Sequence, residues 1–527
     1  MENKKTAYWI PMVMATCMAI GLYLGNSLTP QSDQILSSGE ERYQKIQDII
    51  HILDQRYVDS LDGQALFENT IADMLHSLDP HSNYIPAEQL KAMNEAIEGK
   101  FGGVGVRFFI IRDTVCVTNV IPNSPAMNAG LKSGDKILSV DGKAIAGKKI
   151  TNEDLMGMLK GQEGTKVNVT VFRNGKRINK QVVRGSIPVE SVVAAYMISN
   201  DVGYVRINQF SVVTAKEFRA ASDELRRKGL KKMILDLRNN GGGVLTGATE
   251  IADEFLGANV PIVETRGEHS AKYTYRATSK GNLKDVELVI LINSNSASAS
   301  EILAGAIQDN DRGTVIGRRS FGKGLVQEDF GLRDGSNLRL TIARYYTPTG
   351  RCIQKPYSED YNAYFEDQIE RYDNGELFHV DSSLFVDSLK FKTPGGRTVY
   401  GGGGIMPDIF VPFDSTGSSW YYTELRYSPT FNTFAFDYVQ NRRNKWKSPE
   451  DFNKHFIVTE DLLKRFADFA FEEHGVQRNE KDLAISKVLI SRTIKAEIAR
   501  QIWVEQGYYQ IINSDDVDVR EALKHLD

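Results

Sequence analysis

The sequence predicts a mixed α/β protein of several domains, with an α/β core, a small β-rich module before it and helical regions at both ends. Three observations lead to this prediction. Apolar runs of strand length alternate with amphipathic helical stretches between residues 187 and 350. Short β-branched runs separated by Gly, Asn and Asp fill residues 99–186. Apolar residues at helical spacing dominate residues 33–98 and 430–527.

The composition is that of an ordinary globular protein. The 527 residues include 64 basic and 68 acidic side chains, which gives a net charge of −4. This balance leaves no basic surplus that would attract nucleic acid, so we expect no nucleic-acid partner. Three cysteines are too few for a disulfide framework, and no His-Glu-x-x-His or Cys/His cluster indicates a metal.

The first apolar segment predicts export. Lys4 and Lys5 precede an uncharged stretch, residues 7–25, which is just long enough to cross a bilayer as a helix. Because lysines in front of such a helix keep the N-terminus in the cytoplasm, we expect a single-pass protein of the inner membrane with its main part on the periplasmic side. A cleaved signal peptide and a lipoprotein modified at Cys17 stay open as alternatives, and both also export the chain.

The regions that follow differ in pattern. Residues 33–98 are expected to be helical, with a turn at Asp79-Pro80-His81-Ser82. Residues 99–186 contain five β-rich runs and one helix candidate, Asn152–Leu159, and their length suits an independent β-sandwich or barrel. In the α/β region, Thr214-Ala-Lys-Glu217 predicts a capping box, whereas residues 351–412 are expected to be rich in loops.

These patterns give a provisional order of domains. The predicted domains are a transmembrane anchor over 1–26, an N-terminal helical region over 33–98, the β-rich module over 99–186, the α/β core over 187–412 and a C-terminal helical region over 413–527. Three roles stay open for the C-terminal helices: self-association, covering the core, or binding a partner.

A run of alternating serines is the most informative motif. Residues 293–301 read Asn-Ser-Asn-Ser-Ala-Ser-Ala-Ser-Glu, where a buried strand gives way to a helix. A serine at a helix N-terminus is usually an N-cap. Because Ser296, Ser298 and Ser300 exceed what capping needs, we interpret at least one of them as a candidate nucleophile. Free backbone N–H groups at this helix end would favour a developing oxyanion.

A serine nucleophile needs a base, and a lysine is the better candidate here. No histidine falls at a strand–loop position of the α/β core, and His81 in the predicted turn is only a minor alternative. Lys323 lies between glycines in residues 320–327, Ser-Phe-Gly-Lys-Gly-Leu-Val-Gln. Burial would have to lower its pKa from about 10.4 to roughly 7–8. Gln327 could hydrogen-bond its amine, and an anchor for a phosphate or carboxylate is the alternative role of the lysine.

A second glycine-rich motif follows a predicted strand. Residues 235–243 read Leu-Asp-Leu-Arg-Asn-Asn-Gly-Gly-Gly. Glycines allow backbone N–H groups to approach a ligand closely, as in an oxyanion hole or a phosphate loop. A Gly-x-x-x-x-Gly-Lys-Ser/Thr motif is absent, and a plain tight turn is the remaining alternative.

Taken together, these motifs resemble those of the C-terminal processing peptidases, also called tail-specific proteases. The resemblance runs from residue 40 to residue 412. It rests on residues 78–82, 101–105, 124–131, 134–138, 236–243, 296–301, 321–324 with Gln327, 346–350 and 404–408. It implies an α/β crotonase-like protease core with an inserted PDZ domain, which is mainly β, together with the N-terminal helices and the C-terminal helical region.

The resemblance also implies roles for single residues. It assigns Ser298 as the nucleophile, Lys323 as the base and Gln327 as an assisting residue. The oxyanion hole would use the amide of Ala299 and one amide of the glycine turn, from Gly241 or Gly242. Neither a metal nor an organic cofactor is expected.

The glycine-rich segment near residue 102 has features, independent of the resemblance, that are typical of a PDZ domain. Its N–H groups would turn toward a peptide's terminal carboxylate, beside a strand edge and an apolar pocket. A plain β-turn is the alternative. The predicted peptide-binding residues are Gly102, Gly103, Val104, Gly105, Val106, Leu155, Met158 and Leu159.

We therefore expect a membrane-anchored extracytoplasmic serine endopeptidase that cleaves protein or peptide substrates engaged near their free C-termini. Self-association through the C-terminal helices is a further expectation. An inactive PDZ scaffold, in which Ser298 and Lys323 are merely structural, is one alternative. An acyl-CoA enzyme is another, because the predicted core resembles crotonases, although export separates the chain from CoA.

Overall fold

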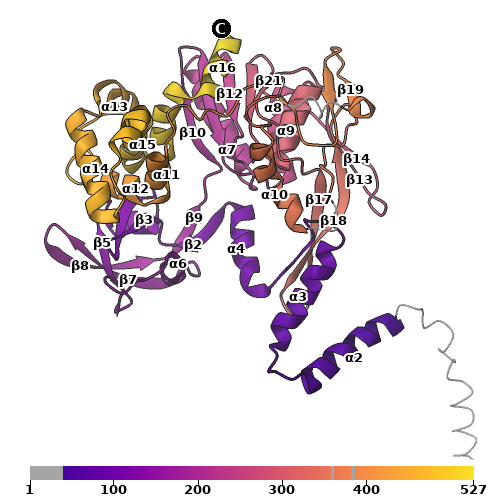
Figure 1. The fold of residues 1–527 in the computed structure, drawn as a ribbon, viewed down its shortest axis with the longest axis horizontal. Coiled ribbons are helices and arrows are strands. Elements are labelled where there is room, and N and C mark those ends of the chain that lie inside the picture. The colour runs from indigo at the N-terminus through magenta and orange to yellow at the C-terminus, as the bar shows by residue number, and fades with distance from the viewer. Residues whose placement is uncertain (1–39, 358–360, 381–385) are drawn as a thin grey trace, which may run out of the picture. The chain divides into compact units, whose positions relative to one another are not determined.

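The computed structural model describes residues 40–357, 361–380 and 386–527, and the chain divides into two units, 1–74 and 75–527. The described part of the first unit consists of helix α2 (Glu40–Arg56) and most of helix α3 (Gly63–His76), both indigo in Figure 1. The predicted helical spacing is confirmed here. Several apolar side chains of these helices are exposed, among them Ile46, Ile49 and Phe67.

The expected membrane location is corrected by the structure. Among residues 40–357, 361–380 and 386–527, no helix is both long enough and apolar enough to cross a bilayer. Even the 33-residue helix α15 (Glu480–Ile512) carries charged side chains along its length. The expectations of an inner-membrane location, a periplasmic catalytic part and membrane contact through an N-terminal helix are therefore withdrawn. The segment that led to them, residues 7–25, lies outside the described residues.

The second unit begins at Leu75, near the end of α3, and the predicted turn at residues 79–82 comes soon after. A short strand, β1 (Asn83–Ile85), follows the turn where continued helix was expected, because it pairs antiparallel with strand β18 (Asn337–Tyr346) far along the chain. Helix α4 (Ala87–Glu98) comes next and ends at Gly99, whose φ of +71° favours glycine.

The β-rich module confirms the predicted strands and helix closely. Its sheet has the order β3-β4-β5-β7-β8, and helix α6 (Asn152–Leu159) begins after a capping box of Thr151 and Asp154. A two-stranded stem, β2 (Lys100–Gly103) with β9 (Gly185–Pro188), connects the module to the rest of the chain. The remaining elements are β3 (Val106–Ile111), β4 (Thr114–Val120), α5 (Pro125–Asn128), β5 (Lys136–Val140), β6 (Lys143–Ala144), β7 (Lys166–Arg173) and β8 (Lys176–Val183).

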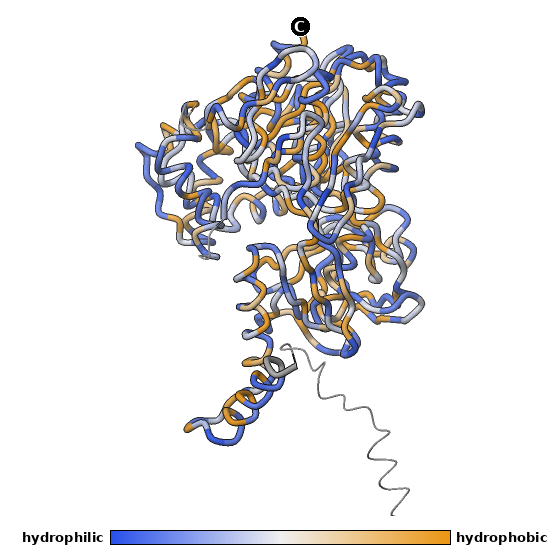
Figure 2. The backbone as a smooth tube through the Cα atoms, turned by 90° about the vertical axis from the view of Figure 1, so that its right-hand side faces the viewer, coloured by the Kyte–Doolittle hydropathy of each residue, from blue (hydrophilic) through white to orange (hydrophobic). Residues whose placement is uncertain are grey.

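The α/β core is built on a six-stranded sheet of order β10-β11-β12-β15-β16-β21, in which only the β10–β11 pair is antiparallel. These strands are β10 (Val192–Met197), β11 (Val202–Ile207), β12 (Lys232–Asp236), β15 (Glu287–Ile292), β16 (Thr314–Gly317) and β21 (Ile409–Phe410). Apolar residues concentrate in the interior of this part of the chain, as the orange tube in Figure 2 shows. Near-continuous apolar runs are typical of strands that are buried on both faces.

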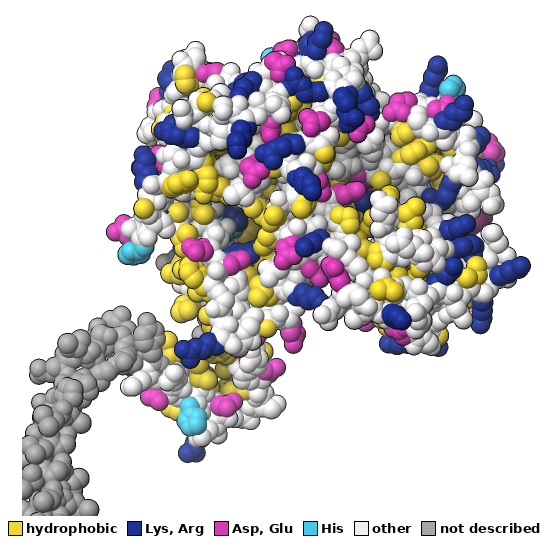
Figure 3. All heavy atoms as spheres, turned by 180° about the vertical axis from the view of Figure 1, so that it is seen from behind, with side chains coloured by type: hydrophobic (Ala, Val, Ile, Leu, Met, Phe, Trp, Pro, Cys, Tyr) yellow, Lys and Arg dark blue, Asp and Glu magenta, His cyan; other side chains and the backbone are white. Residues whose placement is uncertain are grey.

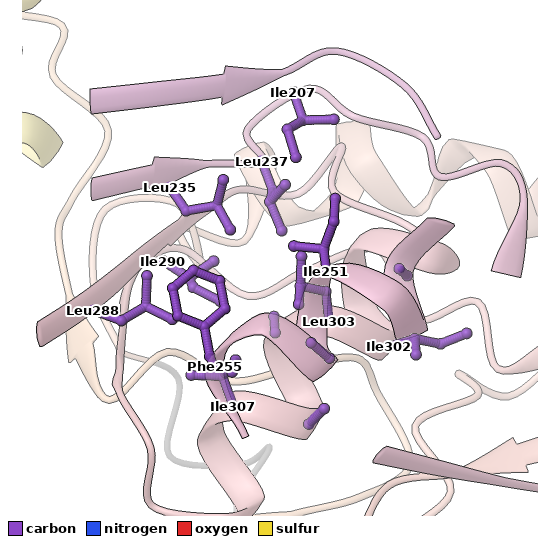
Figure 4. Close-up of a cluster of buried hydrophobic side chains, with 14 of the residues drawn as sticks. Ile207, Leu235, Leu237, Ile251, Phe255, Leu288, Ile290, Ile302, Leu303 and Ile307 are labelled. Atoms are coloured by element: carbon purple, nitrogen blue, oxygen red, sulfur yellow. The ribbon is translucent and has the colours of Figure 1, made fainter. Parts of the chain in front are cut away.

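Helices cover both faces of this sheet. Side chains from α7 (Thr214–Arg227), α8 (Leu245–Phe255) and α9 (Ala299–Asp309) form one apolar cluster with alternate strand residues, including Leu235 and Ile290 (Figure 4). The intervening residues, such as Ile234 and Leu291, face a second cluster that helix α16 (Val517–Leu526) completes. The core is therefore a three-layer α/β structure.

The predicted capping box at the start of α7 is wrong. Val213 is the N-cap residue and makes no side-chain capping bond. Instead, Thr214 Oγ1 donates to Ser191 Oγ, and Glu217 accepts the N–H groups of Ser191 and Val192. Tertiary contacts to the segment before β10 thus use both side chains that the local motif would have paired.

A second sheet has the order β1-β18-β13-β14, with β17 also paired to β18. Its other strands are β13 (Pro261–Arg266), β14 (Tyr273–Arg276) and β17 (Leu325–Gly331). The loop-rich expectation for residues 351–412 needs correction, since helix α10 (Tyr361–Asp373), a short 3-10 turn (Asp387–Leu389) and the hairpin of β19 (Lys390–Lys392) with β20 (Thr398–Tyr400) lie there.

The predicted C-terminal helices are present and have an apolar core of their own. They are α11 (Trp420–Tyr427), α12 (Thr430–Val439), α13 (Pro449–His455), α14 (Glu460–His474) and α15, with a 3-10 turn (Asn513–Asp515) before α16. Phe436 of α12 packs against Ile111 and Cys116 of the β-rich module, and Arg112 pairs with Asp437. On the face seen in Figure 3, basic and acidic side chains are interspersed, as expected for nearly equal numbers of each.

Helix α16 is fastened to the core by buried ion pairs. Arg238, which follows β12, pairs with Asp236 at 2.7 Å, with Asp516 at 2.9 Å and with Asp518 at 2.7 Å. Arg318, which follows β16, also pairs with Asp518 at 2.8 Å. Because Arg238 and Asp518 are buried, each needs several opposite charges around it, and these shared pairs hold α16 against the sheet.

Candidate active site

The three alternating serines have different surroundings. Ser296 is buried and its hydroxyl donates to the Leu237 carbonyl at 2.8 Å. Ser300 is buried too and donates to the Asn240 carbonyl at 2.9 Å. Ser298 is only half-buried and lines a cavity. Two serines therefore fasten the turn, and Ser298 is the one that a substrate can reach.

The backbone of Ser298 is strained. Its φ of +56° and ψ of −114° are a conformation that a residue with a Cβ rarely adopts, at a cost of about 1–3 kcal/mol. Helix α9 begins at the next residue, and among the described residues the N–H of Ala299 has no hydrogen-bond acceptor. A strained serine beside a free amide at a helix N-terminus is the arrangement that a nucleophile with an oxyanion site requires.

Lys323 lies on the segment between β16 and β17 and lines the same cavity as Ser298. Burial, assisted by the nearby positive charge of Arg339, lowers the pKa of its amine from 10.5 to about 8, whereas the negative charges of Glu301 and Asp79 oppose this shift. At pH 7 an amine with this pKa is neutral in roughly one molecule in ten. Within the described chain, its Nζ makes no hydrogen bond, so the lone pair of the neutral form is available.

One buried carboxylate connects the serine and lysine segments. Glu301 Oε2 accepts the N–H groups of Ser298 at 2.8 Å and Lys323 at 2.9 Å. Its Oε1 accepts the N–H of Gly322 at 2.7 Å and the hydroxyl of Ser320 at 2.5 Å. Burial raises the pKa of the Glu301 carboxyl to about 7, and the four donors act against that rise. The backbones of both candidate catalytic residues are therefore positioned by the same side chain.

The glycine turn lies against the serine turn. A Cβ on Gly242 would come within 2.7 Å of both Ser298 Cβ and the Ala297 carbonyl, and its φ is +98°. The N–H of Gly242 donates to Asn240 Oδ1 at 2.9 Å, so it is already engaged. The N–H of Gly241 has no acceptor among the described residues. Gly242 is thus needed for the close approach of the two turns, and Gly241 offers the free amide.

The structure places Gln327 in the same cavity, on strand β17. Its Nε2 donates to Thr341 Oγ1 at 3.2 Å, and no hydrogen bond joins it to Lys323 in the described part of the chain. His81, the minor alternative for a base, bonds to the Tyr364 hydroxyl at 3.0 Å. Burial and the charge of Lys323 lower the pKa of His81 to about 3, so it stays neutral at physiological pH.

The cavity has a volume of about 620 Å³ and a mixed lining. Apolar side chains from α4, α8 and β17 line it, namely Ile97, Leu245 and Leu325. The charged side chains of Asp329 and Arg339 also line it. Among the described residues, no cluster of His, Cys, Asp and Glu has the arrangement of a metal site. The lining suits an extended peptide with an apolar side chain near Ser298.

The β-rich module positions its candidate residues in two groups. Gly102 and Gly103 lie in β2, and a Cβ on Gly102 would meet the Gly161 carbonyl at 2.3 Å. Val104 and Gly105 follow as a turn whose N–H groups have no partners in the described chain, and Val106 begins β3. Leu155 and Leu159 are buried in the core of the module with Val104, whereas Met158 is half-buried at its edge.

Sequence reasoning missed three residues that organise the site. Glu301 was quoted only as the end of the serine run, although its position three residues after Ser298 is a capping-box spacing. The hydroxyl of Tyr345 lies within hydrogen-bond distance of the carbonyls of both Ser298 and Lys323. Asp79, in the predicted turn, accepts the Thr341 hydroxyl, and its charge acts on the pKa of Lys323; only the motif around it gave a signal.

Known protein families match the regions that carry these residues. Residues 201–362 match the model of peptidase family S41, and residues 102–183 match that of the PDZ domain. Residues 421–504 match a family of unknown function, DUF8443.

Relatives with assigned names decide the family. The carboxy-terminal-processing protease of Bartonella bacilliformis is 39% identical over 345 residues, which cover 63% of this chain and 78% of that protein. The chain belongs to the S41 family of C-terminal processing peptidases. Carboxy-terminal processing protease CtpA of Bacillus subtilis is similar to this peptidase as well, at 31% identity over 358 residues, which cover 67% of this chain and 76% of the relative.

A solved structure is also similar to this C-terminal processing peptidase. The photosystem II D1 C-terminal processing protease is 29% identical, with coverage of 58% of this chain and 89% of its own and a TM-score of 0.34. The family matches and the named relatives make the S41 peptidase a serine-type endopeptidase that carries a PDZ domain, as the sequence motifs predict. Its S41 region contains both Ser298 and Lys323.

Proposed function

We propose that this peptidase cleaves its substrates with Ser298 as the nucleophile and Lys323 as the general base. The observation that supports this most strongly is the shared setting of the two residues. Both line one cavity, both are tied through their backbone N–H groups to Glu301, and the pKa of the Lys323 amine is lowered to about 8. A base whose pKa lies near the working pH is suited to proton transfer.

The proposed reaction uses two proton transfers in each half. Ser298 Oγ attacks the scissile carbonyl carbon while its proton moves to the lone pair of Lys323 Nζ. The resulting ammonium then gives that proton to the leaving amine as the peptide C–N bond breaks, which leaves an acyl-enzyme ester on Ser298. A water molecule attacks this ester, with Lys323 again taking and returning a proton, and releases the new carboxyl end.

The proposed oxyanion site consists of the N–H groups of Ala299 and Gly241. The sequence left Gly241 and Gly242 as alternatives, and the engagement of the Gly242 N–H with Asn240 favours Gly241. Donors fixed by the surrounding backbone need no reorganisation when charge develops, and removal of one such donor typically costs about 10²- to 10³-fold in kcat.

Substrate capture is proposed for the PDZ domain. The unpartnered N–H groups of Val104 and Gly105 would bind the terminal carboxylate of a substrate, and the edge beginning at Val106 would pair with its backbone. Burial of Leu155 and Leu159 in the domain core leaves Met158 as the more accessible apolar contact. Substrates would therefore be protein or peptide chains with free C-termini.

The proposed domain limits remain those expected from the sequence: 33–98, 99–186, 187–412 and 413–527. A crotonase-like type for the core is part of this proposal and finds support in its helix-covered, mainly parallel sheet. Self-association through the C-terminal helices stays a prediction, and the exposed apolar side chains of Val488 and Phe471 are consistent with it.

A peptide-cleavage assay tests the proposal. Ser298→Ala and Lys323→Ala should each lower kcat at least 10³-fold in folded protein, whereas Lys272→Ala, which removes an exposed lysine paired with Glu264 just before β14, should leave it unchanged. A fluorophosphonate probe should label the wild type but not Ser298→Ala. Full-rate cleavage by Lys323→Ala would refute the assignment of the base.

Amidation of the substrate's C-terminus should raise KM if the PDZ domain captures the carboxylate.

A further inference from the structure

The turn at Asp79–Ser82 is held together by an aspartate and then attached to the site. Asp79 Oδ1 accepts the N–H groups of His81 at 2.8 Å and Ser82 at 2.9 Å, and Oδ2 accepts the Ser82 hydroxyl at 2.6 Å. Asp79 and Ser82 are buried. An aspartate that bonds the backbone two residues on fixes a turn in one conformation.

This turn docks on strand β18 through Thr341. The N–H of Thr341 donates to Ser82 Oγ at 3.0 Å, and the Thr341 hydroxyl donates to Asp79 Oδ1 at 3.0 Å. The pairing of β1 with β18 continues the same contact, with Asn83 opposite Arg339. A segment more than 250 residues earlier in the chain thus contacts the strand beside the catalytic cavity.

Thr341 lies opposite Gln327 in the β17–β18 pair, where the register shifts between Val326 and Gln327. An irregularity of this kind can turn a side chain toward a neighbouring site. Gln327 Nε2 donates to Thr341 Oγ1 at 3.2 Å. Asp79, Thr341 and Gln327 therefore form a chain of hydrogen bonds that ends in the cavity of Ser298 and Lys323.

The single proton of the Thr341 hydroxyl determines whether the Gln327 amide presents its nitrogen or its oxygen to Thr341. A carboxylate can only accept, so the Thr341 proton goes to Asp79. The Thr341 oxygen must then accept from Gln327, and the Gln327 amide presents its nitrogen to Thr341. Its oxygen is left without a partner among the described residues and is available to the amine of Lys323.

We propose that Asp79 and Thr341 are positioning residues of the peptidase site, which fix the Gln327 amide so that its oxygen accepts an N–H of the Lys323 amine. This inference rests on the proposed role of Lys323 as the base. With one N–H bound to Gln327, the Lys323 lone pair is directed toward Ser298 Oγ. A reversed amide would donate to that lone pair and block proton transfer.

Asp79 has a second effect through its charge. Its carboxylate favours the protonated form of Lys323 and so opposes the effects of burial and of Arg339 on the lysine pKa. Loss of this charge should lower the pKa of Lys323. A role limited to packing the turn would not change the titration of the lysine, so the pH profile separates the two roles.

Matched variants of Thr341 test the proposal on the full chain. Thr341→Val removes the hydroxyl and should lower kcat roughly 3- to 10-fold with KM unchanged, whereas Thr341→Ser keeps the hydroxyl and should retain near wild-type kcat. Thr265→Val is the control, because its hydroxyl lies on β13 of the same sheet and makes no hydrogen bond in the described chain. In Asp79→Asn, the acid limb of the kcat/KM profile should move to lower pH.

The outcomes separate this inference from the proposed function. Equal losses in Thr341→Val and Thr341→Ser, or no loss in either, would overturn the positioning role while Lys323→Ala stays inactive. An active Lys323→Ala would instead overturn the base assignment itself. If Asp79→Asn fails to fold, the Thr341 pair still decides, since Thr341→Ser preserves the bond to Asp79.

Discussion

Replacement of Glu301 by glutamine tests whether one carboxylate holds the catalytic segments together. Glutamine keeps the size of the side chain but exchanges one acceptor oxygen for an NH₂ group. In the most favourable orientation the amide oxygen keeps the N–H groups of Ser298 and Lys323, and the NH₂ faces Ser320 and Gly322. The Ser320 hydroxyl can rotate to accept, but the Gly322 N–H is left without an acceptor.

The expected loss follows from this count. One buried, unsatisfied donor costs about 1–3 kcal/mol in the free energy of unfolding. A shift of the backbone at Gly322 also moves the neighbouring Lys323, and a displacement of about 1 Å at a reacting group can lower kcat roughly 100-fold. Because the Glu301 charge favours protonated Lys323, its removal should also move the acid limb of the pH–rate profile to lower pH.

Glu217→Gln provides the matched control. Burial raises the pKa of the Glu217 carboxyl too, but its two backbone bonds, from Ser191 and Val192, use the same oxygen, which glutamine retains. Urea unfolding followed by circular dichroism and steady-state cleavage of a peptide would compare the two variants. Wild-type stability, kcat and pH profile in Glu301→Gln would show that the carboxylate does not couple the two segments.

Four further outcomes follow from the structure. The kcat/KM for peptide cleavage should rise with pH through a midpoint near 8, because the proposed base is the neutral form of Lys323; a profile flat from pH 6 to 10 would contradict this proposal. Gly242→Ala should lower kcat at least 100-fold at unchanged peptide binding by the PDZ domain, since its Cβ would lie 2.7 Å from Ser298 Cβ, whereas the unhindered Gly331→Ala serves as its control. Arg238→Met should lower the free energy of unfolding by about 1–3 kcal/mol, measured by urea titration, because Asp236, Asp516 and Asp518 each lose an ion pair, while Arg206 and Arg318 still pair with Asp236 and Asp518. The thiol of Cys116, whose pKa burial raises to about 11, should react with a thiol reagent only after unfolding.

Local pattern predicted much of the fold. The five β-rich runs predicted within residues 99–186 are strands and helix α6 has the predicted bounds, since β-branched runs and a capped amphipathic segment end at turn residues there. Strands β1 and β17 were missed because their pairing partner, β18, lies elsewhere in the chain. A strand that is defined by long-range pairing leaves little signal in its own residues.

The site shows the same division. Ser298 and Lys323 could be singled out because their motifs are unusual for a plain cap or a surface charge. The choice between Gly241 and Gly242 could not be made, since it depends on a hydrogen bond to the Asn240 side chain. The membrane expectation arose from residues 7–25 and the two lysines before them, which lie outside the described residues.

The position of α16 has a consequence for the order of events during synthesis. The ribosome releases the strands of the core sheet long before it releases residues 517–526, which cover one face of that sheet and supply acidic partners to Arg238. Arg238 directly follows Leu237, whose carbonyl holds Ser296 in the nucleophile turn. The serine turn therefore rests on a strand end whose ion pairs are complete only after residues 517–526 have been made and have packed on the sheet.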